Sequence, residues 1–294
     1  MTDILLTAAR LDAALGSDRP PVVLDVRSVS GRADRDSYLA GHLPGAVFLD
    51  LDADLAAPPG AGGRHPLPAP EDLQRSWRRA GISDGSPIVV YDAEDASIAA
   101  RAWWLLRWSG VPAADIQVLD GGFAAWERNG STVEAGGGRV PRPGSIVVRP
   151  GGMPSVSADE AAELASGHGV LLDARAAARY RGEIEPLDRI AGHIPGAVNL
   201  PLTDLLTSGG TFREPAELEV LFEEVVPDQS TTVAASCGSG VTACHLVLAG
   251  ALIDRQLALY PGSYSGWLAL GRDVVVGAEP MGLPVKTRAG GPRR

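Results

Sequence analysis

PVVLDVR at residues 21–27 returns as GVLLDAR at residues 169–175, and this repeat decides the fold. Three more blocks recur in the same order along the chain. They are GHLPGA (41–46) with GHIPGA (192–197), IVVYD (88–92) with VAASC (233–237), and LDGGFAAW (119–126) with YPGSYSGW (260–267). Four blocks that keep their order indicate a duplication, so we expect the 294 residues to form two similar domains.

Each copy alternates short apolar runs with helical segments. The predicted strands of the second copy are the buried-type runs VLLDA (170–174), AVNL (197–200), TTVAAS (231–236) and LALY (257–260). The predicted helices cover residues 157–166, 214–225 and 240–252. This alternation predicts an α/β fold in which each domain is a mainly parallel sheet flanked by helices.

The domain boundaries follow from changes in composition. We expect a first domain over residues 1–138 and a second over 156–286. Residues 139–155 are rich in Gly and Pro and are predicted to be the linker. The basic end, residues 287–294, is predicted to be a flexible tail.

Composition excludes several classes of protein. The only cysteines are Cys237 and Cys244, so a disulfide scaffold is excluded and a reducing cytoplasm is expected. The net charge of −10 argues against a nucleic-acid partner. The chain has neither a signal-peptide pattern at its start nor a run of about 18 apolar residues, so no membrane association is expected. The histidines show no zinc-ligand spacing, and neither a metal nor another cofactor is expected.

The candidate nucleophile is Cys237, which follows a predicted strand and precedes Gly-Ser-Gly and an apolar helix. Such a loop can turn successive backbone N–H groups inward, and the helix dipole adds positive charge at the same place. Both stabilise a thiolate. We therefore expect Gly238, Gly240, Val241 and Thr242 to bind an anion, with φ above zero at the two glycines. The alternative is that Cys237 is a small buried apolar residue.

Neither the first-copy counterpart of Cys237 nor the second cysteine is expected to carry sulfur. The first copy has Asp92 where the second has Cys237, and a carboxylate cannot carry sulfur. The first domain is therefore expected to be non-catalytic and to form a wall of the site. Cys244 lies inside the apolar helix, where packing in the core is its expected role.

At this point the residues resemble a known family, the tandem-domain rhodanese sulfurtransferases. The LDVR and LDAR strands, the GHLPGA and GHIPGA loops, LDGGFAAW and above all CGSGVTA (237–243) carry the resemblance. It implies that the second domain takes sulfur from thiosulfate or 3-mercaptopyruvate onto the cysteine as a persulfide. The acceptor would be cyanide, a thiol or a thioredoxin-like protein.

The resemblance also bears on the donor. Thiosulfate-preferring members have CRKGVTA, whose two cations suit a dianion, whereas mercaptopyruvate sulfurtransferases resemble CGSGVTA, so mercaptopyruvate is favoured here and thiosulfate stays open. Arg179 matches the family's substrate-carboxylate arginine, and its alternative is a structural salt bridge. Arg189 is a loose counterpart of a second substrate arginine. Arg175 is assigned to fold maintenance, because Asp-x-Arg recurs in both copies.

Two further candidates and two rival functions complete the prediction. The resemblance assigns Ser239 a catalytic hydrogen bond, with a helix cap as its alternative. His42 is a candidate partner for that serine, although His193 at the equivalent place favours a loop-fixing role.

A cysteine phosphatase is disfavoured because Ala243 stands where phosphatase loops have an arginine. A non-catalytic module that binds anions or partners is the remaining alternative.

Overall fold

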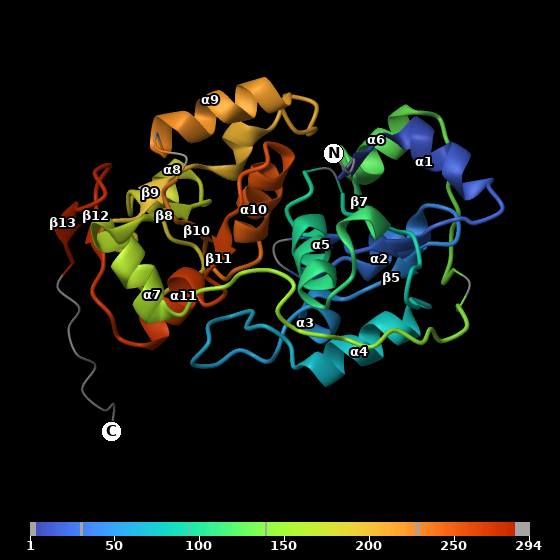
Figure 1. Ribbon diagram of the computed structural model, residues 1–294, viewed down its shortest axis with the longest axis horizontal. Coiled ribbons are helices and arrows are strands. Elements are labelled where there is room, and N and C mark those ends of the chain that lie inside the picture. Colours follow the sequence, from blue (N-terminus) through green and yellow to red (C-terminus); the bar gives the residue numbers. More distant parts are fainter. Residues whose placement is uncertain are drawn as a thin grey trace.

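The structure is a computed structural model that describes residues 4–29, 32–93, 95–138, 140–226, 228 and 230–285. The two halves of the chain form two α/β domains that lie side by side, the first in blue to green and the second in yellow to red (Figure 1). The predicted tail at residues 287–294 lies outside the described residues.

The first domain is built on a five-stranded parallel sheet with the strand order β1-β7-β6-β2-β5. Its strands are β1 (Leu5–Leu6), β2 (Val22–Asp25), β5 (Val47–Phe48), β6 (Ile88–Tyr91) and β7 (Ile116–Leu119), with an antiparallel pair of β3 (Ser28–Val29) and β4 (Arg32–Ala33) beside them. Its helices are α1 (Ala8–Leu15), α2 (Arg35–Ala40), α3 (Leu51–Asp54), α4 (Pro70–Arg79), α5 (Ala99–Trp108), α6 (Gly122–Arg128) and the short η1 (Ala113–Asp115).

The second domain repeats this plan with a four-stranded parallel sheet, β11-β10-β8-β9. Its strands are β8 (Val170–Asp173), β9 (Val198–Asn199), β10 (Val233–Ser236) and β11 (Ala258–Leu259), and β12 (Val275–Val276) pairs antiparallel with β13 (Leu283–Pro284). Its helices are α7 (Ala158–Glu163), α8 (Ala177–Tyr180), α9 (Pro215–Val225), α10 (Ala243–Leu252), α11 (Ser263–Ala269) and the short η2 (Leu164–His168) and η3 (Leu202–Leu205).

The predicted elements of the second copy are present, with small shifts at their ends. The capping box that predicts α7 is formed: Ser157 accepts the N–H of Glu160, and the Glu160 carboxylate accepts the N–H of Ser157. Helix α10 begins at Ala243 rather than at residue 240, because residues 237–242 form a loop around Cys237. We call residues 237–242 the Cys237 loop.

The Asp-x-Arg repeat holds the same place in both domains. Nε and Nη2 of Arg27 both donate to the Asp25 carboxylate, and Arg175 donates to Asp173 in the same way, with all four side chains buried. Each arginine also donates to the carbonyl of the glycine that opens the following Gly-His-x-Pro-Gly-Ala loop, at 2.6 Å and 2.9 Å. The pair therefore fixes that loop to the end of a strand, which supports the assignment of Arg175 to fold maintenance.

The two domains share one apolar core. Helix α5 of the first domain packs against α10 of the second at the centre of the molecule (Figure 1). A single cluster of buried apolar residues joins Trp104 and Leu106 of α5 to Leu246 of α10. Between the domains, the described residues of 139–155 form neither helix nor strand, and Ser155 pairs with Leu259 at the edge of the second sheet.

Each domain also extends a loop onto the other. Residues 59–66 of the first domain reach the Cys237 loop, as detailed below. In return, Phe212 of the second domain donates its N–H to Asp120 at 3.0 Å, and Gly209 accepts a hydrogen bond from Arg128. No helix within the described ranges combines the length and apolar character needed to span a bilayer.

Candidate active site

Main-chain amides converge on the sulfur of Cys237. Its Sγ accepts the N–H of Ser239 at 3.4 Å and the N–H of Gly240 at 3.1 Å. The residue is only 1% exposed, so the sulfur lies at the base of the loop. Gly240 has φ of +81°, as the tight curl requires, whereas the expectation of positive φ at Gly238 is wrong. Two N–H groups aimed at one sulfur can donate hydrogen bonds to a negative charge placed there.

The first domain keeps the same kind of loop but fills it with its own anion. The Asp92 carboxylate accepts the N–H groups of Ala96, Ile98 and Ala99 at 2.9–3.0 Å. Burial, reinforced by Asp95, raises the pKa of Asp92 to about 6. The loop type thus collects N–H groups around a negative charge in both domains, and only the second domain has a sulfur there.

Ser239 is linked to a histidine that the sequence analysis did not select. His65, from the first domain, lies with Nδ1 2.8 Å from Ser239 Oγ and Nε2 3.2 Å from Asp52 Oδ1. Burial lowers the pKa of His65, although Asp52 opposes the shift. A neutral ring that donates Nε2–H to a carboxylate has its Nδ1 lone pair free to accept from a hydroxyl. The arrangement can therefore move a proton through the Ser239 hydroxyl.

His42 does not take this place, which corrects its candidate role. Its Nδ1 lies 2.9 Å from the carbonyl oxygen of Tyr38, and the two rings stack at 4.1 Å. His193 repeats both contacts with Tyr180, at 2.8 Å and 3.8 Å. Both histidines hold their loops, and the partner of Ser239 is His65.

Two arginines from different domains meet above Gly238. A Cβ atom added to Gly238 would lie 2.8 Å from Nη2 of Arg64 and 3.6 Å from Nη2 of Arg179. Arg179 comes from α8, whereas Arg64 belongs to the 59–66 segment of the first domain. The glycine after the cysteine thus leaves room for two guanidinium groups, which are suited to bind a carboxylate or another oxyanion.

Arg189 does not supply the second cation, which corrects that expectation. Its Nη2 donates to the carbonyl oxygen of Leu268 at 2.8 Å, and the residue does not line the pocket. The second guanidinium beside Gly238 is that of Arg64. One comparison within the sequence could have drawn attention to Arg64. A Gly-Gly pair occurs in both copies, at Gly62-Gly63 and at Gly209-Gly210, but Arg64 and His65 follow it in the first copy, whereas Thr and Phe follow it in the second.

These residues line one cavity of about 680 Å³. Arg179, Gly238, Ser239, Val241 and Thr242, all selected from the sequence, contribute to its wall. Arg64, His65 and Asp52 of the first domain form the facing side. A cavity of this size admits a small anion to the mouth of the Cys237 loop.

A buried arginine of the first domain supports the loop from behind. Arg101 of α5 is fully buried, and it donates to the carbonyl oxygens of Gly240 at 3.1 Å, Leu55 at 3.2 Å and His65 at 3.2 Å. Burial lowers the pKa of Arg101, and the nearby thiols of Cys244 and Cys237 oppose that shift. Arg101 thus joins the first domain to the Cys237 loop of the second.

Cys244 behaves as the core residue that the sequence predicted. It is fully buried, and its thiol donates weakly to the Gly240 carbonyl at 3.4 Å. Burial raises its pKa to about 12. Cys237 and Cys244 are both free thiols. A thiol so hard to ionise is a poor partner for exchange with Cys237.

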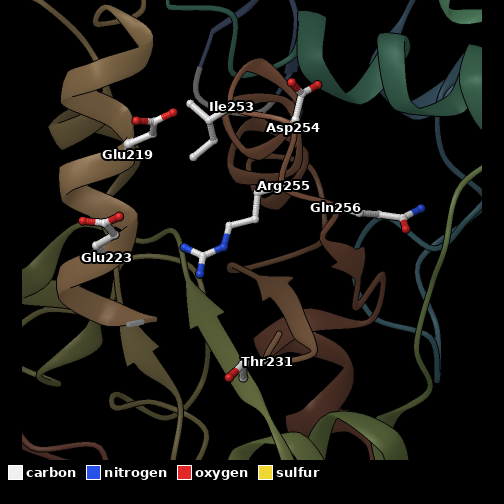
Figure 2. A pocket seen from close by; sticks show the side chains of 7 residues that line it. All are labelled: Glu219, Glu223, Thr231, Ile253, Asp254, Arg255 and Gln256. Carbon is white, nitrogen blue, oxygen red and sulfur yellow. The ribbon is translucent and has the colours of Figure 1, made fainter. Parts of the chain in front are cut away.

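A separate cavity of about 320 Å³ lies between α9 and the residues that follow α10 (Figure 2). Its wall includes Glu219, Glu223, Asp254 and Arg255, and Arg255 also donates to the carbonyl of Val226. It contains neither cysteine nor histidine. No group of side chains suited to a metal ion occurs within the ranges that the structure describes.

Comparison with known proteins gives one consistent result. The rhodanese-like domain profile matches residues 7–129 and again residues 157–270. A protein of Mycobacterium tuberculosis named "Putative thiosulfate sulfurtransferase SseB" is 41% identical over 90% of this chain and 93% of its own. A protein of Pseudomonas aeruginosa named "Probable 3-mercaptopyruvate sulfurtransferase" is 42% identical over 90% of this chain and 94% of its own.

Solved structures agree with these relatives. The crystal structure of SseA from Escherichia coli, described as a 3-mercaptopyruvate sulfotransferase, superposes with a TM-score of 0.77 and 32% identity. The match covers 90% of this chain and all of that one. With a rhodanese-like domain in each half and relatives that match along nearly its whole length, the chain belongs to the rhodanese family, as a tandem-domain sulfurtransferase.

Proposed function

We propose that the chain takes a sulfur atom from 3-mercaptopyruvate onto Cys237 as a persulfide and passes it to a thiol. The chain is a sulfurtransferase of the 3-mercaptopyruvate or thiosulfate type. The observation that carries the proposal is the pair of N–H groups, from Ser239 and Gly240, that point at the Cys237 sulfur. They favour both the attacking thiolate and the anionic persulfide that replaces it.

The first half of the reaction forms one S–S bond and breaks one C–S bond. The Cys237 thiolate attacks the donor sulfur, and the electron pair of the C–S bond remains on the carbon as pyruvate enolate. The proton of the donor thiol must then reach that carbon to give pyruvate. Ser239 and His65 can accept the proton of the donor thiol and return it to the enolate carbon, because the hydroxyl and the ring are in hydrogen-bond contact.

This proton transfer distinguishes the two donors. Thiosulfate carries no proton on its outer sulfur, and its leaving group, sulfite, needs none for departure. A Ser239–His65–Asp52 relay therefore has a task only with mercaptopyruvate, which supports mercaptopyruvate as the donor. Arg64 and Arg179 would bind the donor's carboxylate above Gly238.

Thiosulfate is the second candidate donor. Two guanidinium groups over Gly238 provide the pair of cations that a dianion needs, although they do not come from the loop itself. The name of the M. tuberculosis relative points in the same direction. In that reaction the Cys237 thiolate would displace sulfite from the outer sulfur.

The second half of the reaction returns the enzyme to its starting state. A thiol acceptor, including a thioredoxin-like protein, or cyanide would attack the outer sulfur of the persulfide and release the Cys237 thiolate.

The second domain, 156–286, is proposed to be the catalytic one. The first domain, 1–138, has no cysteine but supplies Arg64 and His65 to the pocket. The free thiols support the proposal of a reducing, cytoplasmic setting.

The proposal is tested by turnover with both donors. Purified protein is mixed with 3-mercaptopyruvate or thiosulfate and a thiol acceptor, and pyruvate, sulfite and sulfide are measured. The proposal expects a higher kcat/KM with mercaptopyruvate and ping-pong kinetics with a simple thiol. Turnover with neither donor would favour a non-catalytic binding module. Hydrolysis of an aryl phosphate that depends on Cys237 would favour a phosphatase.

A further inference from the structure

A carboxylate lies between the two arginines of the pocket. Asp188 pairs through Oδ1 with Nη1 of Arg64, and its Oδ2 lies 3.5 Å from Nη2 of Arg179. The Asp188 side chain is only 6% exposed. Its Oδ2 makes no hydrogen bond within the described residues, and its ion-pair partner is Nη2 of Arg179.

A second acid nearby has a different task. Glu185 accepts a hydrogen bond from Arg179 at 2.7 Å, and it also accepts the N–H groups of Leu187 and Asp188 at 3.0 Å. Glu185 therefore holds the turn that places Asp188. Asp188 is left as the carboxylate that bridges the two domains at the pocket.

The charges at this place nearly cancel before any donor arrives. Arg64 and Arg179 bring two positive charges, and Asp188 and Glu185 bring two negative ones. Arg175 also lies 3.6 Å from Glu185, but its own charge is matched by Asp173. A donor with one negative charge adds that single charge to a nearly neutral cluster of side chains. A dianion adds two negative charges to the same partly buried cluster, which is less favourable. Burial raises the pKa of Asp188, with Arg64 opposing, which shows that desolvation already acts against negative charge here.

We propose that Asp188 is a specificity-determining residue that favours singly charged sulfur donors over doubly charged ones. The inference rests on the proposed sulfurtransferase function and deepens it, because it names the charge class of the donor. Asp188 competes with the donor's anionic group for Arg64 and Arg179, and the competition costs a dianion more than a monoanion. Asp188 thereby offsets the dianion preference that two arginines alone would give.

The test compares three donors that separate charge from shape. Mercaptopyruvate carries one negative charge and thiosulfate two, while methanethiosulfonate has the shape of thiosulfate with one charge. We measure kcat/KM for each with wild type and with Asp188→Asn, which removes the charge at nearly constant shape. The expected result is a rise of about tenfold for thiosulfate relative to both monoanions, equal to about 1.4 kcal/mol and found mainly in KM.

Two matched variants control for other effects. Asp188→Glu keeps the charge and should keep the wild-type ratios. Glu183→Gln removes one negative charge from an exposed ion pair with Arg181 in the same segment, and it should also leave the ratios unchanged. A purely structural role for Asp188 would lower kcat/KM for all three donors by the same factor.

Each outcome has one meaning. Unchanged donor ratios in Asp188→Asn, in a wild type that turns over mercaptopyruvate, overturn the specificity role and leave the proposed function intact. A wild type inactive with every donor overturns the proposed function itself. If Asp188→Asn does not fold, Asp188→Ser carries the same expectation. Should neither fold, the wild type must still use methanethiosulfonate better than thiosulfate, and the reverse preference refutes the proposal.

Discussion

The position of the proton on the His65 ring decides what Ser239 can do. With Nε2–H directed at Asp52, Nδ1 accepts the Ser239 hydroxyl hydrogen, and Oγ is left with lone pairs toward the cavity. This pairing joins residues 174 positions apart in the chain. No local pattern reveals such a contact, which explains why sequence reasoning proposed His42, the histidine of a recognisable motif.

Replacement of His65 by Asn tests the relay at the scale of a single residue. Asn cannot accept and return the proton of Ser239, so kcat with mercaptopyruvate should fall by about 10²- to 10⁴-fold. Turnover with thiosulfate, which needs no proton transfer, should fall far less. Steady-state kinetics with the two donors measure the difference. Equal losses with both donors would assign His65 to the architecture of the pocket alone.

At the scale of elements, the Cys237 loop contains two glycines that act differently. A Cβ on Gly240 would lie 2.2 Å from the carbonyl oxygen of Pro261, and φ there is +81°. A Cβ on Gly238 would meet the flexible ends of two side chains, Arg64 at 2.8 Å and Arg179 at 3.6 Å. The sequence predicted the loop and its glycines, but the close approach of Pro261 and Arg64 is tertiary.

The two alanine variants should therefore separate stability from binding. Gly240→Ala is expected to lower the free energy of unfolding by more than about 2 kcal/mol and to abolish turnover. Gly238→Ala is expected to change it by less than about 1 kcal/mol while raising KM, because Arg64 must move. Urea unfolding and steady-state kinetics give both quantities. Equal destabilisation by the two variants would contradict the geometry of the loop.

Helix α10 carries a buried histidine that makes stability depend on pH. His245 is fully buried and stacks on Phe212 at 4.5 Å, and burial lowers its pKa to about 4. Since the folded-state pKa lies below the unfolded value of about 6.5, the unfolded chain binds the proton first as pH falls. His245 should therefore cost up to about 3 kcal/mol of stability between pH 6.5 and 4.

Denaturant unfolding across that pH range measures this effect. His245→Phe keeps an aromatic ring against Phe212 and should lose less stability between pH 6.5 and 4 than wild type does. His168→Gln, at an exposed position, serves as the control and should keep the wild-type pH dependence. A His245→Phe variant with the wild-type pH dependence would exclude His245 as its source.

At the scale of the whole molecule, the duplication could be predicted because the repeated blocks can be read directly from the amino-acid sequence. Two parallel sheets, the strand before Cys237 and the Asp-x-Arg pairs all follow from those blocks. The contribution of the first domain to the pocket could not be predicted in detail. Arg64 and His65 act across the domain interface, and only the folded chain shows which residues face each other there.

Arg101 tests that interface. Arg101→Met removes the guanidinium that donates to the carbonyls of Leu55, His65 and Gly240, so stability should fall by about 2–5 kcal/mol and turnover should fall with it. Because one apolar cluster spans both domains, wild type should unfold in a single transition. Arg107→Met, on the same helix, is the matched control and should cost much less. Two well-separated wild-type transitions in calorimetry would contradict the shared core.

The most direct test is the mass of the protein after reaction with mercaptopyruvate in the absence of any acceptor. The account predicts that the protein gains one sulfur atom, and that this atom is located on Cys237 and not on Cys244. A Cys237→Ser variant should gain none. No added sulfur on wild type, or sulfur located on Cys244, would contradict the claim that the amides around Cys237 hold a persulfide.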